Sequence, residues 1–251
     1  MTDVEKKVVE DLQNKLNTVF SNEELLFEAL VHTSYYNEQK QSGRAEIKSN
    51  ERLEFLGDAV VDLLICEILY KEYPNLNEGM MAKIKAAVAS EEVLSDIARS
   101  LELGNFLFLG KGEEKSGGRA RNSILADTLE SLIAAIYMDL GYEKVKELFW
   151  ERFKFYINEV LEGRRLFDYK TALQEIIQKR YHVIPEYTLV KTEGKGHNKI
   201  FFVEVKVKGE TYGKGSGRSK KEAEKRAAKE AYEKLVRDHE DNPGLPSLRR
   251  M

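Results

Sequence analysis

Three acidic residues, Glu51, Glu54 and Asp58, are spaced so that they project from one stripe of a predicted helix. That helix continues into a nearly uninterrupted apolar run over residues 59–70, which is typical of a helix buried inside a domain. Acidic residues in a first turn also complement the helix dipole, but this explanation accounts for Glu51, partly for Glu54 and hardly for Asp58. Carboxylates that repel one another beside a hydrophobic core require a proton or a cation.

A second acidic pair, Asp127 and Glu130, interrupts another apolar helix that is predicted to end at about residue 140. Small residues fill much of this helix, a composition typical of a buried helix that packs closely against its neighbours. If the two helices face each other, Asp127 and Glu130 join Glu54 and Asp58. Four carboxylates suit Mg²⁺ and leave coordination positions for water and phosphate. The sequence therefore predicts a metal site between two helices.

The segment Glu-Arg-Leu-Glu-Phe-Leu-Gly-Asp-Ala-Val at residues 51–60 resembles the signature of the ribonuclease III family at every position. The segment around Asp127 and Glu130 resembles the second acidic motif of that family, and the resemblance extends over residues 1–237. It implies an endoribonuclease that hydrolyses double-stranded RNA with Mg²⁺, or with Mn²⁺ as a substitute. The expected products have 5′-phosphate and 3′-hydroxyl ends with short 3′ overhangs, and the implied role is rRNA and mRNA processing.

The same resemblance implies a homodimer that offers one catalytic centre to each RNA strand. It places the aromatic ring of Phe55 in a socket of the partner subunit. It also gives Glu54, Asp58, Asp127 and Glu130 the metal-binding, catalytic role, whereas Glu51 is expected to orient its surroundings. The metal is expected to activate water and to stabilise charge on the leaving 3′-oxygen.

The net charge of −3 divides unevenly along the chain. Residues 168–237 carry 17 Lys and Arg against 10 Asp and Glu, a net charge of +7, so the remainder of the chain carries −10. A basic module indicates a nucleic-acid partner, whereas an acidic module binds phosphate only with the help of metal ions. The two parts are therefore expected to have different partners.

Composition also indicates where the protein is located and which kinds of site it is expected to lack. No run approaches 18 apolar residues and the N-terminus is charged, so we expect no membrane span, no signal peptide and a cytoplasmic protein. The single cysteine, Cys66, is expected to be a small buried hydrophobic residue of the signature helix. The glycine-rich segment 110–119 lacks the spacing of a P-loop, so no small-molecule cofactor is expected.

Helical periodicity dominates the first 160 residues, which contain no convincing strand. We therefore predict an all-α endonuclease domain over residues 1–162, followed by a linker at residues 163–167. Residues 37–49 are polar and lack periodicity, which predicts a loop. His32 has no acidic or nucleophilic partner in the sequence and is interpreted as a hydrogen-bonded structural residue.

Beyond the linker, residues 168–238 follow the order helix, strand, strand, strand, helix. The second strand, at residues 199–207, alternates apolar and polar side chains, and an alanine-rich face marks the last helix. This α+β order is similar to the double-stranded RNA-binding domain. The whole chain is thus predicted to be multidomain, with a disordered tail at residues 239–251.

The resemblance places the first helix and the first hairpin in minor grooves of A-form RNA, and the start of the last helix at phosphates. The implied contacts are Thr171, Gln174 and Glu175 on the first helix, His197 in the hairpin, and Lys220, Lys221 and Lys225 on the last helix. Glu224 departs from the pattern, because many such domains carry Lys there. For the first two lysines, ordinary solvated side chains are the alternative.

Two other functions are alternatives to an endoribonuclease. A non-cleaving RNA-binding regulator on the same fold would not need the four carboxylates, and uncompensated anions would repel RNA. A di-iron carboxylate bundle would need Glu-x-x-His on its helices. None of the four histidines has Glu three residues before it, so this second alternative is excluded.

Overall fold

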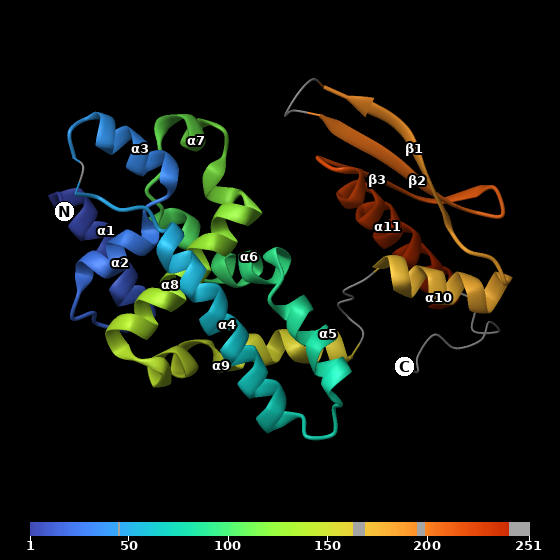
Figure 1. The fold of residues 1–251 in the computed structure, drawn as a ribbon, viewed down its shortest axis with the longest axis horizontal. Helices are drawn as coiled ribbons and strands as arrows, with labels where there is room; N and C mark the ends of the chain where they lie inside the picture. The colour runs from blue at the N-terminus through green and yellow to red at the C-terminus, as the bar shows by residue number, and fades with distance from the viewer. Residues whose placement is uncertain (45, 163–168, 195–198, 241–251) are drawn as a thin grey trace. The chain divides into compact units, whose positions relative to one another are not determined.

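The computed structural model describes residues 1–44, 46–162, 169–194 and 199–240, with the backbone alone for 236–240. The chain forms two compact units, Met1–Arg165 and Leu166–Met251 (Figure 1). The predicted linker at 163–167 lies outside the described residues. The division between the two units falls within this range. No helix of the described residues has the length and apolar composition needed to cross a bilayer.

The first unit is helical, as predicted, and its described residues form no strand; a single bridge pairs Val31 with Phe108. The helices are α1 (Asp3–Leu16), α2 (Glu23–Leu30), α3 (Thr33–Gln41), α4 (Glu51–Glu72), α5 (Glu78–Val88), α6 (Glu91–Ser100), α7 (Lys111–Lys115), α8 (Asn122–Leu140) and α9 (Tyr142–Leu161), with short 3₁₀ turns η1 (Leu103–Phe106) and η2 (Gly118–Ala120). Side-chain caps fix several helix starts, among them Asn22, Asn77 and Ser90.

Helix α8 is the centre of this unit. It packs against α2, α4, α6 and α9, and its residues from Ile124 to Ile136 are buried except at Asp127 and Glu130. Small and β-branched residues allow these neighbours to approach closely, as the composition predicts. The two acidic side chains therefore interrupt a surface that is otherwise covered.

Helix α4 is buried on one side only, so the prediction that its second half is buried all round is wrong. Val60, Leu64 and Ile68 face the core, whereas Leu63 is 52% exposed and Tyr70 is 77% exposed. Cys66, predicted to be buried, is also exposed. An apolar helix that shows apolar side chains on two sides contacts its own domain with one of them and is available to a partner with the other.

The predicted loop at residues 37–49 is wrong at its start, because α3 continues to Gln41. His32 begins this helix as its N-cap: its Nδ1 accepts a hydrogen bond from the backbone N–H of Ser34. The Ser34 hydroxyl in turn accepts from the backbone N–H of Gly110. The structural role predicted for His32 is therefore confirmed, and the capping residue explains why a polar sequence forms a helix here.

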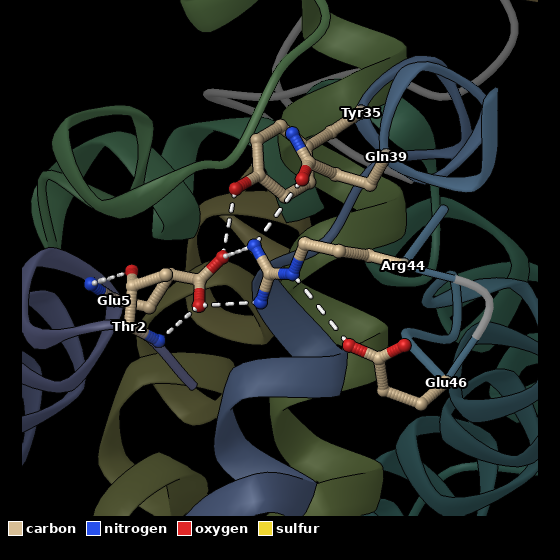
Figure 2. Close-up of polar contacts among 6 residues, drawn as sticks. All are labelled: Thr2, Glu5, Tyr35, Gln39, Arg44 and Glu46. Carbon is tan, nitrogen blue, oxygen red and sulfur yellow. Dashed lines mark hydrogen bonds and ion pairs between the residues drawn. The ribbon is translucent and has the colours of Figure 1, made fainter. Parts of the chain in front are cut away.

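The N-terminal helix is fixed by a buried carboxylate, Glu5, whose side chain is 2% exposed. Figure 2 shows Arg44 approaching it with both terminal nitrogens, at 2.8 and 2.9 Å. The Tyr35 hydroxyl donates at 2.8 Å and the backbone N–H of Thr2 donates at 2.6 Å. A bidentate guanidinium pair with two further donors satisfies a buried carboxylate and lowers the pKa of Glu5 to about 2, despite the opposing effect of burial.

We expect Glu5→Gln to destabilise the protein by about 3 kcal/mol at pH 7, because it removes the charged group that both terminal nitrogens of Arg44 contact. Since the pKa of Glu5 is lowered on folding, its contribution is complete above pH 4.5 and is lost as the pH falls towards about 2. The parent should therefore lose stability between these pH values more steeply than the variant. Urea unfolding at several pH values measures both effects; equal pH profiles would contradict this role.

The second unit has the predicted α-β-β-β-α order. Its elements are α10 (Tyr169–Tyr181), β1 (Glu186–Glu193), β2 (Ile200–Val207), β3 (Glu210–Gly217) and α11 (Lys220–Glu240). The strands form an antiparallel sheet in the order β1-β2-β3. Lys208 and Gly209, both at positive φ, form the tight turn between β2 and β3. Helix α11 includes the first two residues of the predicted tail, and residues 241–251 lie outside the described part.

The core of this unit confirms the predicted faces. The buried residues are Leu173 and Ile177 of α10, Val203, Val205 and Val207 of β2, and Ala223, Ala227, Ala228, Ala231 and Leu235 of α11, with Tyr169. Helix α11 packs directly on β3, where a Cβ at Gly215 would lie 2.1 Å from the backbone oxygen of Ala223. Alanines on the helix and alternating glycines on the strand therefore permit backbone contact.

Candidate metal-dependent nuclease site

The candidate site forms where α4 crosses α8. At Gly57 the backbones of the two helices touch, because a Cβ there would lie 2.0 Å from the backbone oxygen of Glu130. The hydroxyl of Ser131 further ties α8 to α4 by donating to the backbone oxygen of Asn50 at 3.2 Å. Glu54 precedes Gly57 by about one turn, so this crossing brings its carboxylate to the acidic pair of α8.

Three of the predicted carboxylates meet at this crossing. Glu54, Asp127 and Glu130 each offer an oxygen atom, and the three atoms lie within 4.8 Å of one another. All three side chains are partly buried. Among the residues that the structure describes, no Lys or Arg forms an ion pair with any of them. This is a concentration of negative charge that no described protein cation neutralises.

Burial is the main reason why the pKa values of these carboxyl groups are raised. It raises the pKa of Glu130 to about 8, and the nearby charges of Asp58, Asp127 and Glu54 add to the shift. Burial likewise raises the pKa of Asp127 to about 6, helped by Glu54 and Glu91, and that of Glu54 above its ordinary value. Without a cation, the site therefore shares at least one proton at neutral pH.

The donor set fits a divalent cation. Mg²⁺ binds carboxylate oxygens at about 2.1 Å, so ligands on opposite sides of one ion are about 4 Å apart. Oxygens within 4.8 Å of one another reach such an arrangement with small side-chain rotations. A hard cation would also replace the shared protons and remove the repulsion among the carboxylates, and it would still leave positions for water and phosphate.

The structure places Asp58 and Glu51 beside this group but outside it. Asp58 is exposed, and of the neighbouring charges it has the largest effect on Glu130. Glu51 is exposed, accepts a hydrogen bond from the Ser49 hydroxyl at 2.8 Å, and contributes to the raised pKa of Glu54. The arrangement thus joins three of the four predicted ligands directly and leaves Asp58 one turn away on the solvent side.

The side chains predicted to contact RNA lie on the outer faces of their helices. Thr171, Gln174 and Glu175 are exposed on α10, opposite its buried residues. Lys220, Lys221 and Lys225 are exposed at the start of α11. His197 lies outside the described residues.

Glu224, which departs from the resemblance, has a structural role. Its carboxylate lies 2.7 Å from Lys170 Nζ of α10 and 3.9 Å from Lys220 Nζ, and its side chain is only 16% exposed. It therefore joins the two helices of this unit and partly neutralises one of the predicted phosphate-binding lysines. The acidic residue thus forms an internal ion pair at a position where the resemblance implies a lysine.

Comparisons with known proteins agree with this arrangement. Residues 22–156 match the family described as Ribonuclease-III-like, and residues 169–235 match the double-stranded RNA binding motif. Ribonuclease 3 of Pseudothermotoga lettingae is 53% identical over 238 residues, which cover 95% of this chain and 100% of that protein. The chain belongs to the ribonuclease III family. Ribonuclease 3 of Natranaerobius thermophilus is 47% identical over 90% of this chain and 95% of its own.

Solved structures of the ribonuclease III family share the fold of the first unit. The nuclease domain of Ribonuclease III from Campylobacter jejuni matches with a TM-score of 0.52 and 37% identity, covering 58% of this chain and 96% of that one. That structure concerns flexibility in a region involved in dimer formation of the Campylobacter protein. With its nuclease domain and RNA-binding motif, this chain is a ribonuclease III-type endoribonuclease that acts on double-stranded RNA.

Sequence reasoning missed three charged residues around this ribonuclease III site. Asp62 follows Asp58 by one turn of α4 and contributes to the raised pKa of Glu130. Glu91, in the first turn of α6, contributes to that of Asp127. Lys85 of α5 pairs with Asp62 at 2.6 Å. The spacing of Glu54, Asp58 and Asp62 at four-residue intervals could have indicated the first, whereas the other two depend on tertiary packing.

The exposed apolar side chains of α4 form a second feature beside the carboxylates. Phe55 is 83% exposed, and an apolar stripe continues along the same helix. Its members are Phe55, Ala59, Leu63, Cys66 and Tyr70. With 3.6 residues per turn, these positions occupy about a quarter of the helix circumference, directly next to the acidic stripe of Glu54, Asp58 and Asp62.

Proposed function

We propose that this protein cleaves double-stranded RNA by divalent-metal catalysis, with Mg²⁺ as the metal and Mn²⁺ as a substitute. The single observation that carries this proposal is the group of three partly buried carboxylates at the crossing of α4 and α8, none of which forms an ion pair with a described Lys or Arg. Glu54, Asp127 and Glu130 would hold the metal, with Asp58 completing the set from the solvent side. When bound, Mg²⁺ supplies the charge that activates water and stabilises the leaving 3′-oxygen.

The chain's own residues prepare this chemistry. The Gly57 contact fixes the distance between the carboxylates of α4 and α8, so the ligands are held before the metal arrives. Burial of Glu130 and Asp127 makes their charges costly unless a cation is present, which favours metal binding over the empty, ionised state. The +7 charge of residues 168–237 supplies the attraction for RNA that the acidic nuclease unit lacks.

The proposed products carry 5′-phosphate and 3′-hydroxyl ends with short 3′ overhangs, and the proposed substrates are rRNA and mRNA precursors in the cytoplasm. The test is incubation of a long perfect RNA duplex with and without Mg²⁺, followed by analysis of the ends. We expect short duplexes with these ends only when Mg²⁺ is present. An intact duplex at several salt concentrations would favour a non-cleaving RNA-binding protein instead.

The staggered cut requires two catalytic centres, and we propose that the protein forms a homodimer through the apolar stripe of α4. Phe55 is an aromatic side chain that is 83% exposed, and a contiguous apolar stripe on one helix is typical of a protein–protein interface. Because the acidic stripe borders it, a twofold contact here would place the two metal sites close to a common RNA helix.

We expect Phe55→Asp to give a monomer at micromolar concentration, since a twofold contact buries the new charge twice. Val19→Asp is the matched control, because Val19 is 82% exposed and lies outside the stripe. Sedimentation velocity measures the oligomeric state of the parent and both variants. If Phe55→Asp sediments as the parental dimer does, the contact lies elsewhere on the surface.

A further inference from the structure

An ion pair joins α5 to the acidic stripe of α4. Lys85 Nζ lies 2.6 Å from Asp62 Oδ2, and both side chains are about one-third exposed, at 33% and 34%. Among the described residues, this is the ion pair that involves the stripe of Glu54, Asp58 and Asp62. The positive charge of Lys85 therefore lies at the end of the row of carboxylates, beside the metal site and open to solvent.

Electrostatics place Lys85 close to the proposed metal ligands. The hydrogen bond that Lys85 donates to Asp62 is the main reason why the pKa of Lys85 is raised, and the charge of Asp58 adds to it. Asp62 in turn contributes to the raised pKa of Glu130. Lys85 and Glu130 thus interact electrostatically with the same two neighbours, Asp58 and Asp62. Lys85 forms no ion pair with the three carboxylates of the metal group.

A cation at this position would offset the repulsion between RNA phosphates and the neighbouring carboxylates when RNA binds. Phosphates flanking the cleaved bond must approach a surface where Asp58 and Asp62 would repel them. An ammonium group has three N–H donors, and the hydrogen bond to Asp62 uses one of them. The other two suit a phosphate oxygen, for which lysine serves as a compact point charge.

We propose that Lys85 binds a non-bridging phosphate oxygen of the RNA backbone next to the cleaved bond, and that Asp62 holds its ammonium group in place until RNA arrives. This inference rests on the proposed function, because it assigns a substrate contact at the same site. It differs from a purely structural role for the ion pair, in which Lys85 would only hold α5 against α4.

The chain offers a closely matched control. Lys154 of α9 pairs with Glu72 of α4 at 2.6 Å, and the side-chain exposures of 30% and 36% are nearly those of the first pair. Glu72 lies ten residues beyond Asp62, about 15 Å along the helix, so Lys154→Gln breaks an equivalent interhelical pair away from the site. Lys85→Arg retains the charge, and Asp62→Asn removes the holding carboxylate.

The experiment compares cleavage kinetics of a defined RNA duplex and Mg²⁺ binding to the free protein, the latter from the Mg²⁺-dependent shift in Tm. We expect Lys85→Gln to lower kcat/KM at least about tenfold, as loss of a charged hydrogen bond does. Lys154→Gln should match the parent, Lys85→Arg should stay within about threefold of it, and Asp62→Asn should fall between. Lys85→Gln should bind Mg²⁺ as well as the parent or about twofold better, because a neighbouring positive charge is gone.

Three results would overturn the proposal while leaving the proposed function intact. Lys85→Gln and Lys154→Gln could cut equally well, or both could lose activity equally, which would make the pair purely structural. Lys85→Gln could also lose Mg²⁺ binding in step with cleavage, which would show that it acts by shaping the carboxylate site. Failure of the parent itself to cut the duplex with Mg²⁺ would overturn the proposed function, and this inference with it.

Discussion

Glu130→Gln is expected to bind duplex RNA with near-normal affinity but to cleave it at least roughly a hundredfold more slowly at ordinary Mg²⁺ concentrations. This loss is larger than the one usually caused by removing a residue that only hydrogen-bonds to a metal ligand. The substitution keeps the shape and one carbonyl oxygen but removes the charge that would hold a cation. The RNA-binding unit is untouched, because Glu130 lies on α8 of the first unit and the basic module lies in the second. Partial recovery is expected at much higher Mg²⁺. A gel shift beside a cleavage time course over a metal titration measures each part.

The same variant has a signature that does not depend on activity. The folded protein keeps the Glu130 proton to about pH 8, whereas the unfolded chain releases it near pH 4.5. Between these values the folded state binds more protons, so the stability of the metal-free parent falls as the pH rises. Glu130→Gln lacks this loss, and at pH 8 we expect it to be more stable than the metal-free parent by on the order of 2 kcal/mol.

Mg²⁺ should reverse this order of stability, so that the parent becomes more stable than Glu130→Gln. It should raise the Tm of the parent, more at pH 8 than at pH 6, because fewer protons compete with it at the higher pH. It should raise the Tm of Glu130→Gln much less. Glu24→Gln, a substitution of an exposed glutamate on α2, serves as the control and should behave as the parent does. A variant that cuts at the parental rate at low Mg²⁺ would remove Glu130 from the proposed ligands.

The carboxylates of the site could be predicted from the sequence because their chemistry conflicts with their surroundings. Asp127 and Glu130 interrupt a helix that is otherwise mostly apolar or built of small residues, and such a conflict is typical of functional positions. The alanine face of α11 and the alternation of β2 were predictable for the simpler reason that their periods match their secondary structure. In each case the information is local, within one helix or strand.

The structure differs from the sequence-based predictions where the burial of a side chain depends on which other elements its helix contacts. The apolar second half of α4 predicts burial, and it cannot distinguish a face covered by its own domain from a face that this domain leaves exposed; Tyr70 and Cys66 lie on the exposed face. Likewise, the helical periodicity of residues 3–17 predicts Val4 on the apolar side of α1, but Val4 is 72% exposed, while Glu5 is buried. Arg44, the ion-pair partner of Glu5, lies 39 residues away along the chain. No pattern within α1 therefore predicts that Glu5 is buried and Val4 is exposed.

The backbone contact at Gly57 links the fold most directly to the site, and Gly57→Ala tests it. A Cβ there would lie 2.0 Å from the backbone oxygen of Glu130 and 2.4 Å from its carbonyl carbon. Neither is the movable end of a side chain, so the two helices must separate. Overpacking of this kind costs about 3 kcal/mol, at the upper end of the usual range. We expect a corresponding loss of stability in urea unfolding.

The loss of activity should exceed what the loss of stability explains. Separation of α4 from α8 moves Glu54 away from Asp127 and Glu130, and a displacement of about 1 Å can cost a hundredfold in rate. Well below its melting temperature, folded Gly57→Ala should therefore cleave at least roughly a hundredfold more slowly and show a weaker Mg²⁺-dependent rise in Tm. The matched control is Gly112→Ala in α7, where an added Cβ meets nothing within 4 Å. Parental cleavage by folded Gly57→Ala would mean that the spacing of the carboxylates does not depend on this contact.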